Sequence, residues 1–239
     1  MWRLFREQLV KKTSILLIPT NCLLCGAVVT GRKPNLCAAC RRDLPKIPAA
    51  CPVCGVSIPE SRICPACLRR EQPFTRTYAA FQYTAPISYL VALMKFRGDL
   101  AAAQALSNLL ADHLIAVDAP KPDLIIPVPL HAGRLRERGF NQAIELSREI
   151  ANRWGIPVRK DLVSRQRATP PQTGLPNRAA RRRNVRKAFA LRAPVSSMKH
   201  AAILDDVMTS GATVTEVARL VAGNGVSRVD VWCCCRAGA

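Results

Sequence analysis

The sequence predicts an α/β protein with a mostly parallel sheet, helices on both faces of that sheet, and a small cysteine-rich module near the N-terminus. Apolar strand-like runs alternate with helical runs from about residue 121 onward, which is the order of a parallel α/β sheet. Four Cys-x-x-Cys pairs lie within 46 residues near the start of the chain. A length of 239 residues fits one main domain with an appended module.

The charge of the chain indicates an anionic partner. It carries 36 Lys and Arg against 16 Asp and Glu, a formal net charge of +20. A charge of this size attracts polyanions, so it favours nucleic acid, a phosphorylated small molecule or an acidic membrane surface as the partner. Hydrophobic residues make up 49% of the chain, which is enough for a packed core and argues against global disorder.

Residues 1–20 are expected to form a short amphipathic helix. Their apolar run, 15–18, is too short for the core of a signal peptide. No stretch of the chain approaches the roughly 18 apolar residues that a membrane span needs. We therefore expect a cytoplasmic protein without membrane insertion, in which the cysteines are reduced thiols or metal ligands.

The eight paired cysteines have the spacing of two zinc sites. Two residues between cysteines allow a tight turn to direct both thiolates at one tetrahedral ion, and two such turns complete a four-thiolate site. The clustering favours two structural Zn²⁺ ions over redox chemistry or loose thiols. The predicted ligands are Cys22, Cys25, Cys37, Cys40, Cys51, Cys54, Cys64 and Cys67.

The spacing favours sequential pairing, with the first four cysteines on one zinc and the second four on the other, while crossed pairing stays open. Because every ligand is a cysteine, neither zinc has an open coordination position. We expect both ions to stabilise a segment that is too small for a core of its own. The remaining cysteines, 233–235, end a strand-like run and are expected to be buried core residues.

Hydrophobic periodicity and motif spacing divide the chain into an N-terminal helix, a zinc module, a connecting region and a main domain. After the helix over 1–20, a double zinc ribbon is expected over 21–72, and residues 73–120 are expected to form a connecting strand and two helices, with Asp99 capping the second helix. Residues 121–239 are expected to form the main domain. The expected strands of that domain are 123–130, 157–164, 187–191, 200–205 and 228–234, and the expected helices are 141–154 and 213–222.

Half of the net charge lies in residues 159–192. This basic segment holds eleven Lys or Arg and one acid, Asp161, and it is rich in Pro, Gly, Asn and Gln. Such a composition predicts a mobile loop with one short helix around residues 178–182.

Asp205 and Asp206 carry the main functional hypothesis. They follow the apolar run 201–204, and ligands of open α/β sheets bind beyond the carboxyl ends of strands. Two carboxylates there are costly unless they are solvated or partnered, and the hydroxyl pair of a ribose is a suitable partner. A helix whose free backbone N–H groups can hold a phosphate opens at Thr209, Ser210, Gly211, Ala212 and Thr213.

Other nucleotide-binding motifs do not match. The chain has no G-x-G-x-x-G after a strand and no G-x-x-x-x-G-K-[ST], so a dinucleotide-binding fold and an ATP P-loop are poor interpretations. A capped helix without a ligand would explain the hydroxyl residues but not two adjacent acids in an apolar setting. The arrangement therefore predicts a pocket for a ribose with a 5′-phosphate.

The stretch "ILDDVMTSGAT" (203–213) resembles the phosphoribosyl pyrophosphate (PRPP) signature of type I phosphoribosyltransferases, with Thr-Ser-Gly in place of the usual Thr-Thr-Gly. Three further stretches and the double zinc ribbon make the chain similar to the ComF family, the competence-related phosphoribosyltransferase-like proteins that include GntX. The three stretches are "LMKFRGD" (93–99), "IPVPLHAGRLRERGFNQA" (126–143) and "RQRATPPQTGLPNRAARRRNVRKAF" (165–189). The resemblance covers nearly the whole chain.

The resemblance implies a type I phosphoribosyltransferase-like fold that binds PRPP together with Mg²⁺. It places Arg134 and Arg138 where these enzymes bind pyrophosphate, a role that suits the guanidinium fork. A solvated basic helix start is the alternative for these arginines. The basic segment 159–192 would be a lid over PRPP, a nucleic-acid groove, or both. No catalytic residue and no acceptor substrate can be assigned.

Two functions follow. In the first, the protein binds PRPP and acts in DNA uptake or natural transformation, with single-stranded DNA on the basic segment 159–192 and competence or DNA-uptake proteins as partners. In the alternative, it is an active phosphoribosyltransferase that acts on an unidentified small-molecule acceptor and has no DNA role. The scarcity of aromatic residues, 5% of the chain, argues for little sequence preference on DNA.

Overall fold

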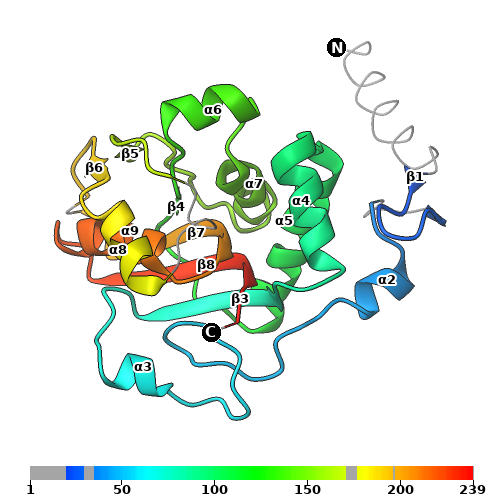
Figure 1. The fold of residues 1–239 in the computed structure, drawn as a ribbon, viewed down its shortest axis with the longest axis horizontal. Coiled ribbons are helices and arrows are strands. Elements are labelled where there is room, and N and C mark those ends of the chain that lie inside the picture. Colours follow the sequence, from blue (N-terminus) through cyan, green and yellow to red (C-terminus); the bar gives the residue numbers. More distant parts are fainter. Residues whose placement is uncertain (1–19, 30–34, 171–176, 196, 239) are drawn as a thin grey trace, which may run out of the picture. The chain divides into compact units, whose positions relative to one another are not determined.

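The structure is a computed structural model of the 239-residue chain and describes residues 20–29, 35–170, 177–195 and 197–238 (Figure 1). The chain forms two compact units, residues 1–44 and 45–239. The helix expected over residues 1–20 lies outside the described residues, except that Thr20 begins strand β1.

The described part of the first unit is small. Strand β1 (Thr20–Asn21) pairs antiparallel with β2 (Val28–Val29), and helix α2 (Ala38–Arg42) follows. The side chain of Cys37 accepts a hydrogen bond from the N–H of Cys40 and so caps this short helix. Side-chain capping of this kind is what allows a helix of one turn to begin without a core beneath it.

A four-stranded, fully parallel sheet is the centre of the second unit. Its strands are ordered β3 (Arg76–Gln82), β8 (Arg228–Arg236), β7 (His200–Met208) and β4 (Leu124–Pro127). The parallel sheet was expected from about residue 121 onward, but β3 belongs to it as an edge strand. The reason is tertiary: β3 finds its partner in the last strand of the chain, and its five central residues are buried.

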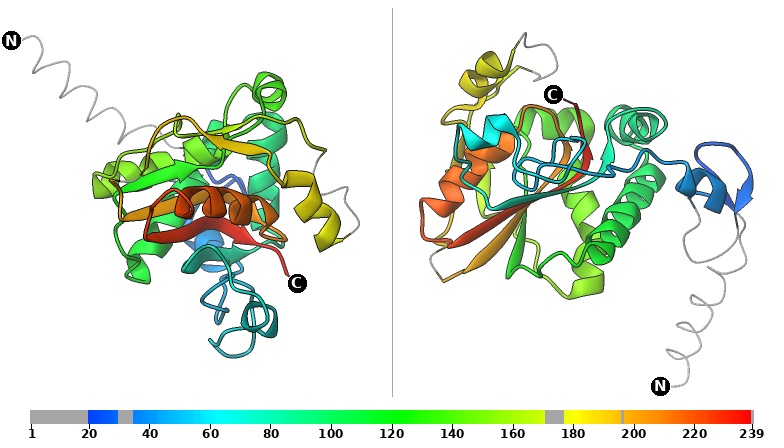
Figure 2. Two further views of the ribbon diagram at one scale, coloured as in Figure 1. Left: turned by 90° about the vertical axis from the view of Figure 1, so that its left-hand side faces the viewer. Right: turned by 90° about the horizontal axis from the view of Figure 1, so that it is seen from below.

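Helices cover both faces of the sheet (Figure 2). Helices α5 (Leu100–Ala116) and α7 (Gln142–Trp154) pack on one face, with α4 (Ile87–Arg97) against α5, while α9 (Ala212–Ala222) packs on the other. As expected, Asp99 caps α5 by accepting a hydrogen bond from the N–H of Ala102 at 2.9 Å. The predicted fold class, an α/β sheet with helices on both faces and a cysteine-rich N-terminal module, is confirmed.

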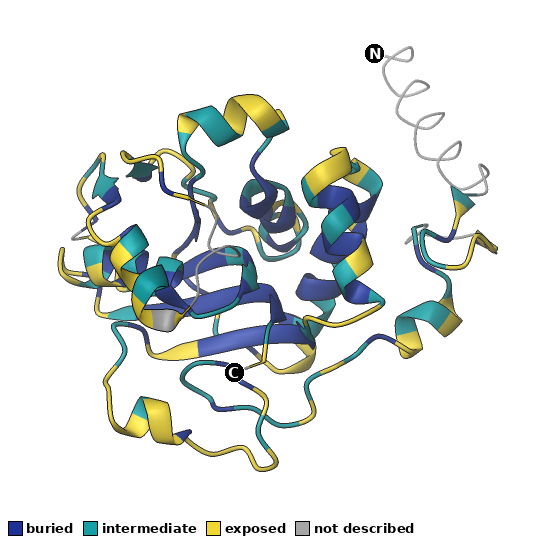
Figure 3. Cartoon of the chain, in the orientation of Figure 1, coloured by how far each residue is buried: buried dark blue, intermediate teal, exposed yellow. Residues whose placement is uncertain are grey.

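The core lies between the sheet and these helices, and it is almost entirely aliphatic (Figure 3). The central strands β7 and β8 are buried along nearly their whole length, as expected for parallel strands covered on both faces. The three consecutive cysteines 233–235 on β8 are fully buried, which confirms their prediction as core residues.

Four short elements lie outside the parallel sheet. Helix α6 (Ala132–Arg138) follows β4 and carries Arg134 and Arg138, for which a basic helix start was one of the two interpretations. In the basic segment, β5 (Val163–Arg165) pairs antiparallel with β6 (Phe189–Leu191), and α8 (Arg178–Val185) lies between them in the chain. The short helix expected around 178–182 is present as α8, and the strand expected over 187–191 is present as β6. Of the strand expected over 157–164, only residues from 163 onward form one, in an antiparallel pair outside the parallel sheet, while Val158 makes an isolated parallel bridge to Ile125.

Candidate functional site

Asp205 and Asp206 lie within strand β7, not after it. The sequence predicted that the strand ends at residue 205, but the ladder with β8 continues through the pair Met208 and Arg236. The extension arises because β8 is equally long and supplies partners to the end. The two acids are thus fixed by a sheet backbone three to four residues before the β7–α9 turn, which comprises residues 209–213.

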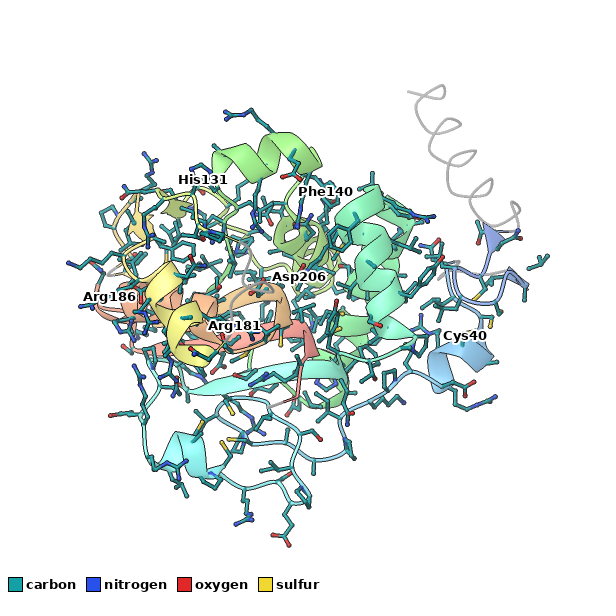
Figure 4. All side chains as sticks on the ribbon, viewed as in Figure 1. Cys40, His131, Phe140, Arg181, Arg186 and Asp206 are labelled. Atoms are coloured by element: carbon teal, nitrogen blue, oxygen red, sulfur yellow. The ribbon has the colours of Figure 1, made fainter. Side chains whose placement is uncertain are left out.

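Asp206 has a partner that sequence reasoning missed. The Nζ atom of Lys95, on α4, lies 2.8 Å from one carboxylate oxygen of Asp206, and the other oxygen accepts the N–H of Val207. Figure 4 labels Asp206. Burial acts to lower the pKa of Lys95, but the charges of Asp206 and Asp205 outweigh it, and the pKa is raised. The available signal was the stretch "LMKFRGD", in which a lysine stands in an otherwise apolar helical run.

Asp205 has a different environment from its neighbour. Burial, together with the charge of Asp206, raises the pKa of Asp205 to about 7, although Lys95 acts in the opposite direction. One of its carboxylate oxygens accepts the N–H of Asp206 at 2.9 Å. Two adjacent acids are therefore made unequal, because one has a close ammonium partner and the other is partly buried beside it.

The β7–α9 turn has the geometry that the sequence predicted for the start of a helix. Gly211 precedes α9 with φ +76°, a left-handed conformation that glycine adopts without strain. A Cβ atom at this position would lie 2.8 Å from the Cε atom of Met208. The hydroxyl of Ser210 accepts the N–H of Ala212 at 3.3 Å.

The turn and Asp205 line one small cavity. Its volume is about 20 Å³, which is room for a water molecule. A sugar phosphate at this site would therefore lie across the mouth of the cavity, against the turn, and not inside it. Thr209, Ser210 and Thr213 are partly exposed there, so their hydroxyls line the same opening.

Arg134 and Arg138, the two arginines predicted to bind pyrophosphate, both lie on α6, but they have different neighbours. The guanidinium of Arg138 lies 6.0 Å from the ring centre of Phe96 and donates to the side chain of Gln142 at 3.2 Å. Arg134 acts electrostatically on Arg165 of β5, and Asp205 acts on Arg165 as well. Arg134 and Asp205 therefore share Arg165 as an electrostatic neighbour, whereas Arg138 contacts Phe96 of α4.

Arg165 is a second residue that sequence reasoning missed. Burial, reinforced by the charges of Arg134 and Arg167, lowers the pKa of this arginine. Its guanidinium donates to the hydroxyl of Thr169 and lies 5.5 Å from the ring centre of Phe189. Its buried Nε atom has no hydrogen-bond partner among the described residues. A partly buried guanidinium with a spare donor near a second arginine is suited to an anion.

The eight cysteines form two groups of four, and the grouping is sequential. The first group is Cys22, Cys25, Cys37 and Cys40; the second is Cys51, Cys54, Cys64 and Cys67. Within each group all Sγ atoms lie within 4.8 Å of one another, and none is in a disulfide. The Sγ atoms of Cys25 and Cys37 are 3.7 Å apart, as are those of Cys54 and Cys64.

These distances fit tetrahedral zinc. Four thiolates at about 2.3 Å from a central Zn²⁺ have their sulfur atoms about 3.8 Å apart. Backbone donors also favour the thiolate form: burial acts to raise the pKa of Cys22, but N–H groups of Cys37, Cys25 and Leu24 overcome it and lower the pKa to about 6. Both groups therefore fit structural zinc, with no coordination position left for a substrate.

The basic segment presents its charge on α8. Asn177 caps this helix by accepting the N–H of Ala180 at 2.9 Å, and the helix packs against α9. The N–H of Lys187 donates to Glu216 of α9 at 2.7 Å. Residues 171–176 and the side chain of Arg178 lie outside the description. Elsewhere in the segment, arginines follow one another at 181–183. Arg181 and Arg186 are labelled in Figure 4.

The hydrogen bonds of His200 and His131 go to residues other than Asp205 and Asp206. His200 begins β7, at the opposite end from the turn, and its ring Nε2 donates to the buried carboxylate of Asp230 at 2.9 Å. His131 caps α6 by accepting the N–H of Gly133 at 3.2 Å.

Within the described ranges, no helix combines the length and apolarity required to traverse a bilayer.

A zinc-ribbon module joined to a parallel α/β sheet defines the class of protein. The family model for a double zinc ribbon domain matches residues 14–68. A purine phosphoribosyltransferase from Pyrococcus horikoshii has 19% identity and a TM-score of 0.31 over 55% of this chain and 70% of its own. A score this low does not establish a shared fold, so the fold class rests on the observed sheet.

The chain belongs to the ComF family, which includes DNA utilization protein YhgH and competence protein F. It is 36% identical over 227 residues to YhgH of Salmonella typhi, covering 93% of this chain and 99% of that protein. It is 31% identical over 226 residues to competence protein F of Haemophilus influenzae, covering 91% and 97%. The resemblance inferred from the sequence motifs is thereby confirmed.

Proposed function

We propose that this protein binds PRPP with Mg²⁺ at the β7–α9 turn and acts in the uptake and use of DNA. The observation that carries the proposal is the grouping of Asp205 and the turn residues 209–213 around one opening, with the cations of Arg134 and Arg165 nearby. Acids for hydroxyls, a helix start for one phosphate and arginines for a second phosphate group are the features that this ligand requires.

Each group has a role that its surroundings support. Asp205 would accept hydrogen bonds from a ribose hydroxyl, and Asp206 would do so while Lys95 fixes its orientation. The amide groups of the turn, with the hydroxyls of Thr209, Ser210 and Thr213, would hold the 5′-phosphate, while Gly211 and Ala212 let the chain approach it closely.

The pyrophosphate group would meet the arginines. Arg134 and Arg165 would contact its oxygens, and Arg138 would approach from the side of α4. Mg²⁺ would come with the ligand, held by oxygen atoms of its phosphates, as is usual for this ion. The protein would supply charge stabilisation and positioning, the two contributions that dominate when a leaving group carries high negative charge.

A role in DNA metabolism is supported by two separate observations. The relatives that span nearly this whole chain are named for DNA utilization and competence. The chain has a formal net charge of +20, half of it in the basic segment 159–192. A surface of this kind binds single strands mainly through their phosphates, with weak sequence preference.

Calorimetric titration of Mg²⁺-PRPP tests the ligand proposal. We expect one site per chain, and we expect Asp205→Asn to weaken binding at least about tenfold, the size of one lost charge-assisted hydrogen bond. Asp118→Asn is the matched control, because Asp118 is exposed after α5 and has a left-handed backbone that asparagine tolerates. Absence of binding to the parent protein, or equal binding by Asp205→Asn, would overturn the proposal.

A second measurement, pyrophosphate release, separates a protein that only binds PRPP from an active transferase. A protein that only binds PRPP leaves it intact, whereas an active phosphoribosyltransferase releases pyrophosphate once a suitable nucleobase or amine is added. Pyrophosphate release should therefore be measured with a panel of nucleobases and with single-stranded DNA. Release that depends on one small acceptor would favour the alternative function.

A further inference from the structure

Arg236 is a buried arginine at the end of β8, and only 5% of it is exposed to solvent. Its guanidinium donates to backbone carbonyl oxygens from three places in the chain. Nε donates to Cys54 at 2.8 Å, and one terminal nitrogen donates to Met208 at 2.9 Å and to Thr209 and Ala237. The planar fork therefore connects the second cysteine group to the beginning of the β7–α9 turn.

The position of Arg236 is fixed by the sheet. Met208 and Arg236 are ladder partners, and the N–H of Ala237 also donates to the carbonyl of Met208, at 3.1 Å. The arginine side chain thus continues the β7–β8 ladder by one further contact, to Thr209. A buried charge is costly unless its donors are satisfied, so this guanidinium is stable only while its carbonyl acceptors stay in place.

Cys54 is one of the four cysteines of the second zinc centre. It belongs to the tight turn in which Gly55 donates to the carbonyl of Cys51 at 2.8 Å. This turn is also docked on β3, where the hydroxyl of Thr77 donates to the carbonyl of Val53 at 2.7 Å. Zinc in this centre would fix the turn, and with it the carbonyl that Arg236 needs.

We propose that Arg236 is a positioning residue that couples the second zinc centre to the β7–α9 turn. With zinc bound, the carbonyl of Cys54 holds the guanidinium, and the guanidinium holds the carbonyls of Met208 and Thr209. Without zinc the cysteine turn opens, Arg236 loses an acceptor, and the start of the β7–α9 turn is released. The occupancy of this centre thereby sets the order of the turn.

Coupling of this kind is reciprocal. If zinc strengthens binding of a sugar phosphate to the turn, the sugar phosphate must strengthen binding of zinc by the same factor. This consequence rests on the proposed function, because it requires a phosphorylated sugar at the turn. The coupling between zinc and the order of the turn does not, and it can be measured on the ligand-free protein.

Two variants test the bridge. Arg236→Lys keeps the charge but has one nitrogen instead of a fork, so it cannot reach both Cys54 and the turn. Arg236→Met removes the charge as well. Thr77→Val is the first control, since it removes one bond between the cysteine turn and β3 but leaves Arg236 intact. Arg153→Met is the second, since Arg153 is another partly buried arginine and it ties α7 to α5.

The measurements are hydrogen exchange at the amides of 209–215, zinc release to a chromogenic chelator, and the affinity for ribose 5-phosphate. Alkylation of the released thiols followed by mass spectrometry identifies which centre has lost its ion. We expect Arg236→Lys to accelerate exchange and release from the second centre and to weaken ribose 5-phosphate binding, each about tenfold, a common size for coupling between sites. Thr77→Val should accelerate zinc release but not hydrogen exchange at the turn, and Arg153→Met should accelerate neither zinc release nor exchange.

A cycle of zinc removal and mutation gives the decisive result. Zinc removal should accelerate exchange at the turn in the parent protein but add little in Arg236→Lys, because the connection is already cut. Equal acceleration in both proteins, or parent-like exchange in a folded Arg236→Lys, would overturn the inference. If the parent binds neither Mg²⁺-PRPP nor ribose 5-phosphate, the proposed function fails, while exchange and zinc release still decide the coupling.

Discussion

The ammonium of Lys95 lies 2.8 Å from a carboxylate oxygen of Asp206, and 20% and 12% of these two side chains are exposed. The contact joins α4 to the centre of the parallel sheet, from segments far apart in the chain. Lys95 neutralises the charge of Asp206, and its ammonium leaves the carboxylate of Asp205 without this ion pair. The pair therefore lowers the cost of two adjacent carboxylates in a largely apolar strand, and it is a partner that the sequence did not reveal.

The first prediction concerns this ion pair. Lys95→Met should lower the free energy of unfolding by about 3–5 kcal/mol, because it leaves the Asp206 carboxylate shielded from water without a partner. Urea unfolding followed by circular dichroism measures the loss. The double variant Lys95→Met/Asp206→Asn should recover most of it, since no unpaired charge remains. Equal free energies of unfolding of the single and double variants would show that the loss in Lys95→Met does not come from an unpaired Asp206 carboxylate.

The second prediction concerns the pH dependence of stability. The pKa of Asp205 is raised to about 7 in the folded protein, against an ordinary value of about 3.9 in an unfolded chain. Between these values the folded protein retains a proton that the unfolded chain has lost, so this group makes the free energy of unfolding fall as pH rises from about 4 to about 7.

Asp205→Asn removes this contribution. The variant should be more stable than the parent at pH 8 by about 1–3 kcal/mol, and the difference should shrink toward pH 5. Urea unfolding at both pH values measures it, and the zinc ligands cancel because both proteins carry them. Asp118→Asn should show no such trend. A difference that is the same at pH 5 and pH 8 would contradict the raised pKa.

The third prediction concerns the metal. The protein should hold about two zinc ions per chain by elemental analysis, and Cys37→Ser and Cys64→Ser should each lower the content to about one, because a four-thiolate site that loses one ligand binds weakly. Cys234→Ser is the control, because Cys234 is a buried thiol outside both groups. Its zinc content should equal that of the parent. Parent protein with far less than two zinc would refute the assignment.

The fourth prediction concerns single-stranded DNA. Replacing Arg181, Arg182 and Arg183 by Gln should weaken binding and lower the slope of log affinity against log salt by about 2, at about 0.7 per phosphate contact. Fluorescence anisotropy with a labelled oligonucleotide over a salt series gives the slope. Arg148→Gln/Arg219→Gln is the control, since both arginines are paired with glutamates on helices outside the basic segment. An unchanged slope in the triple variant would exclude α8 as the contact.

The sequence determined the features that depend on neighbours in the chain. Cysteine spacing predicted two groups of four, and Asp99 was recognised as a cap. Hydrophobic periodicity predicted the helices over 141–154 and 213–222 and the strands that became β4, β7 and β8, but it wrongly extended a strand over 157–164, of which only 163–165 forms one, outside the parallel sheet. The order of residues along the chain also predicted that Asp205 and Asp206 lie on a strand that leads into the glycine-containing turn 209–213. These patterns are readable because turn geometry, helix period and capping act over a few residues.

Only the tertiary structure decided which distant groups meet. Nothing local indicates that β3 pairs with β8, that Lys95 faces Asp206, or that Arg236 reaches the carbonyl of Cys54. Each of these contacts joins segments whose separation is set by the packing of helices on the sheet, and an ion pair or hydrogen bond forms only within a few tenths of an ångström of its ideal distance. Spacing along the chain fixes which groups are available, and packing fixes which of them touch.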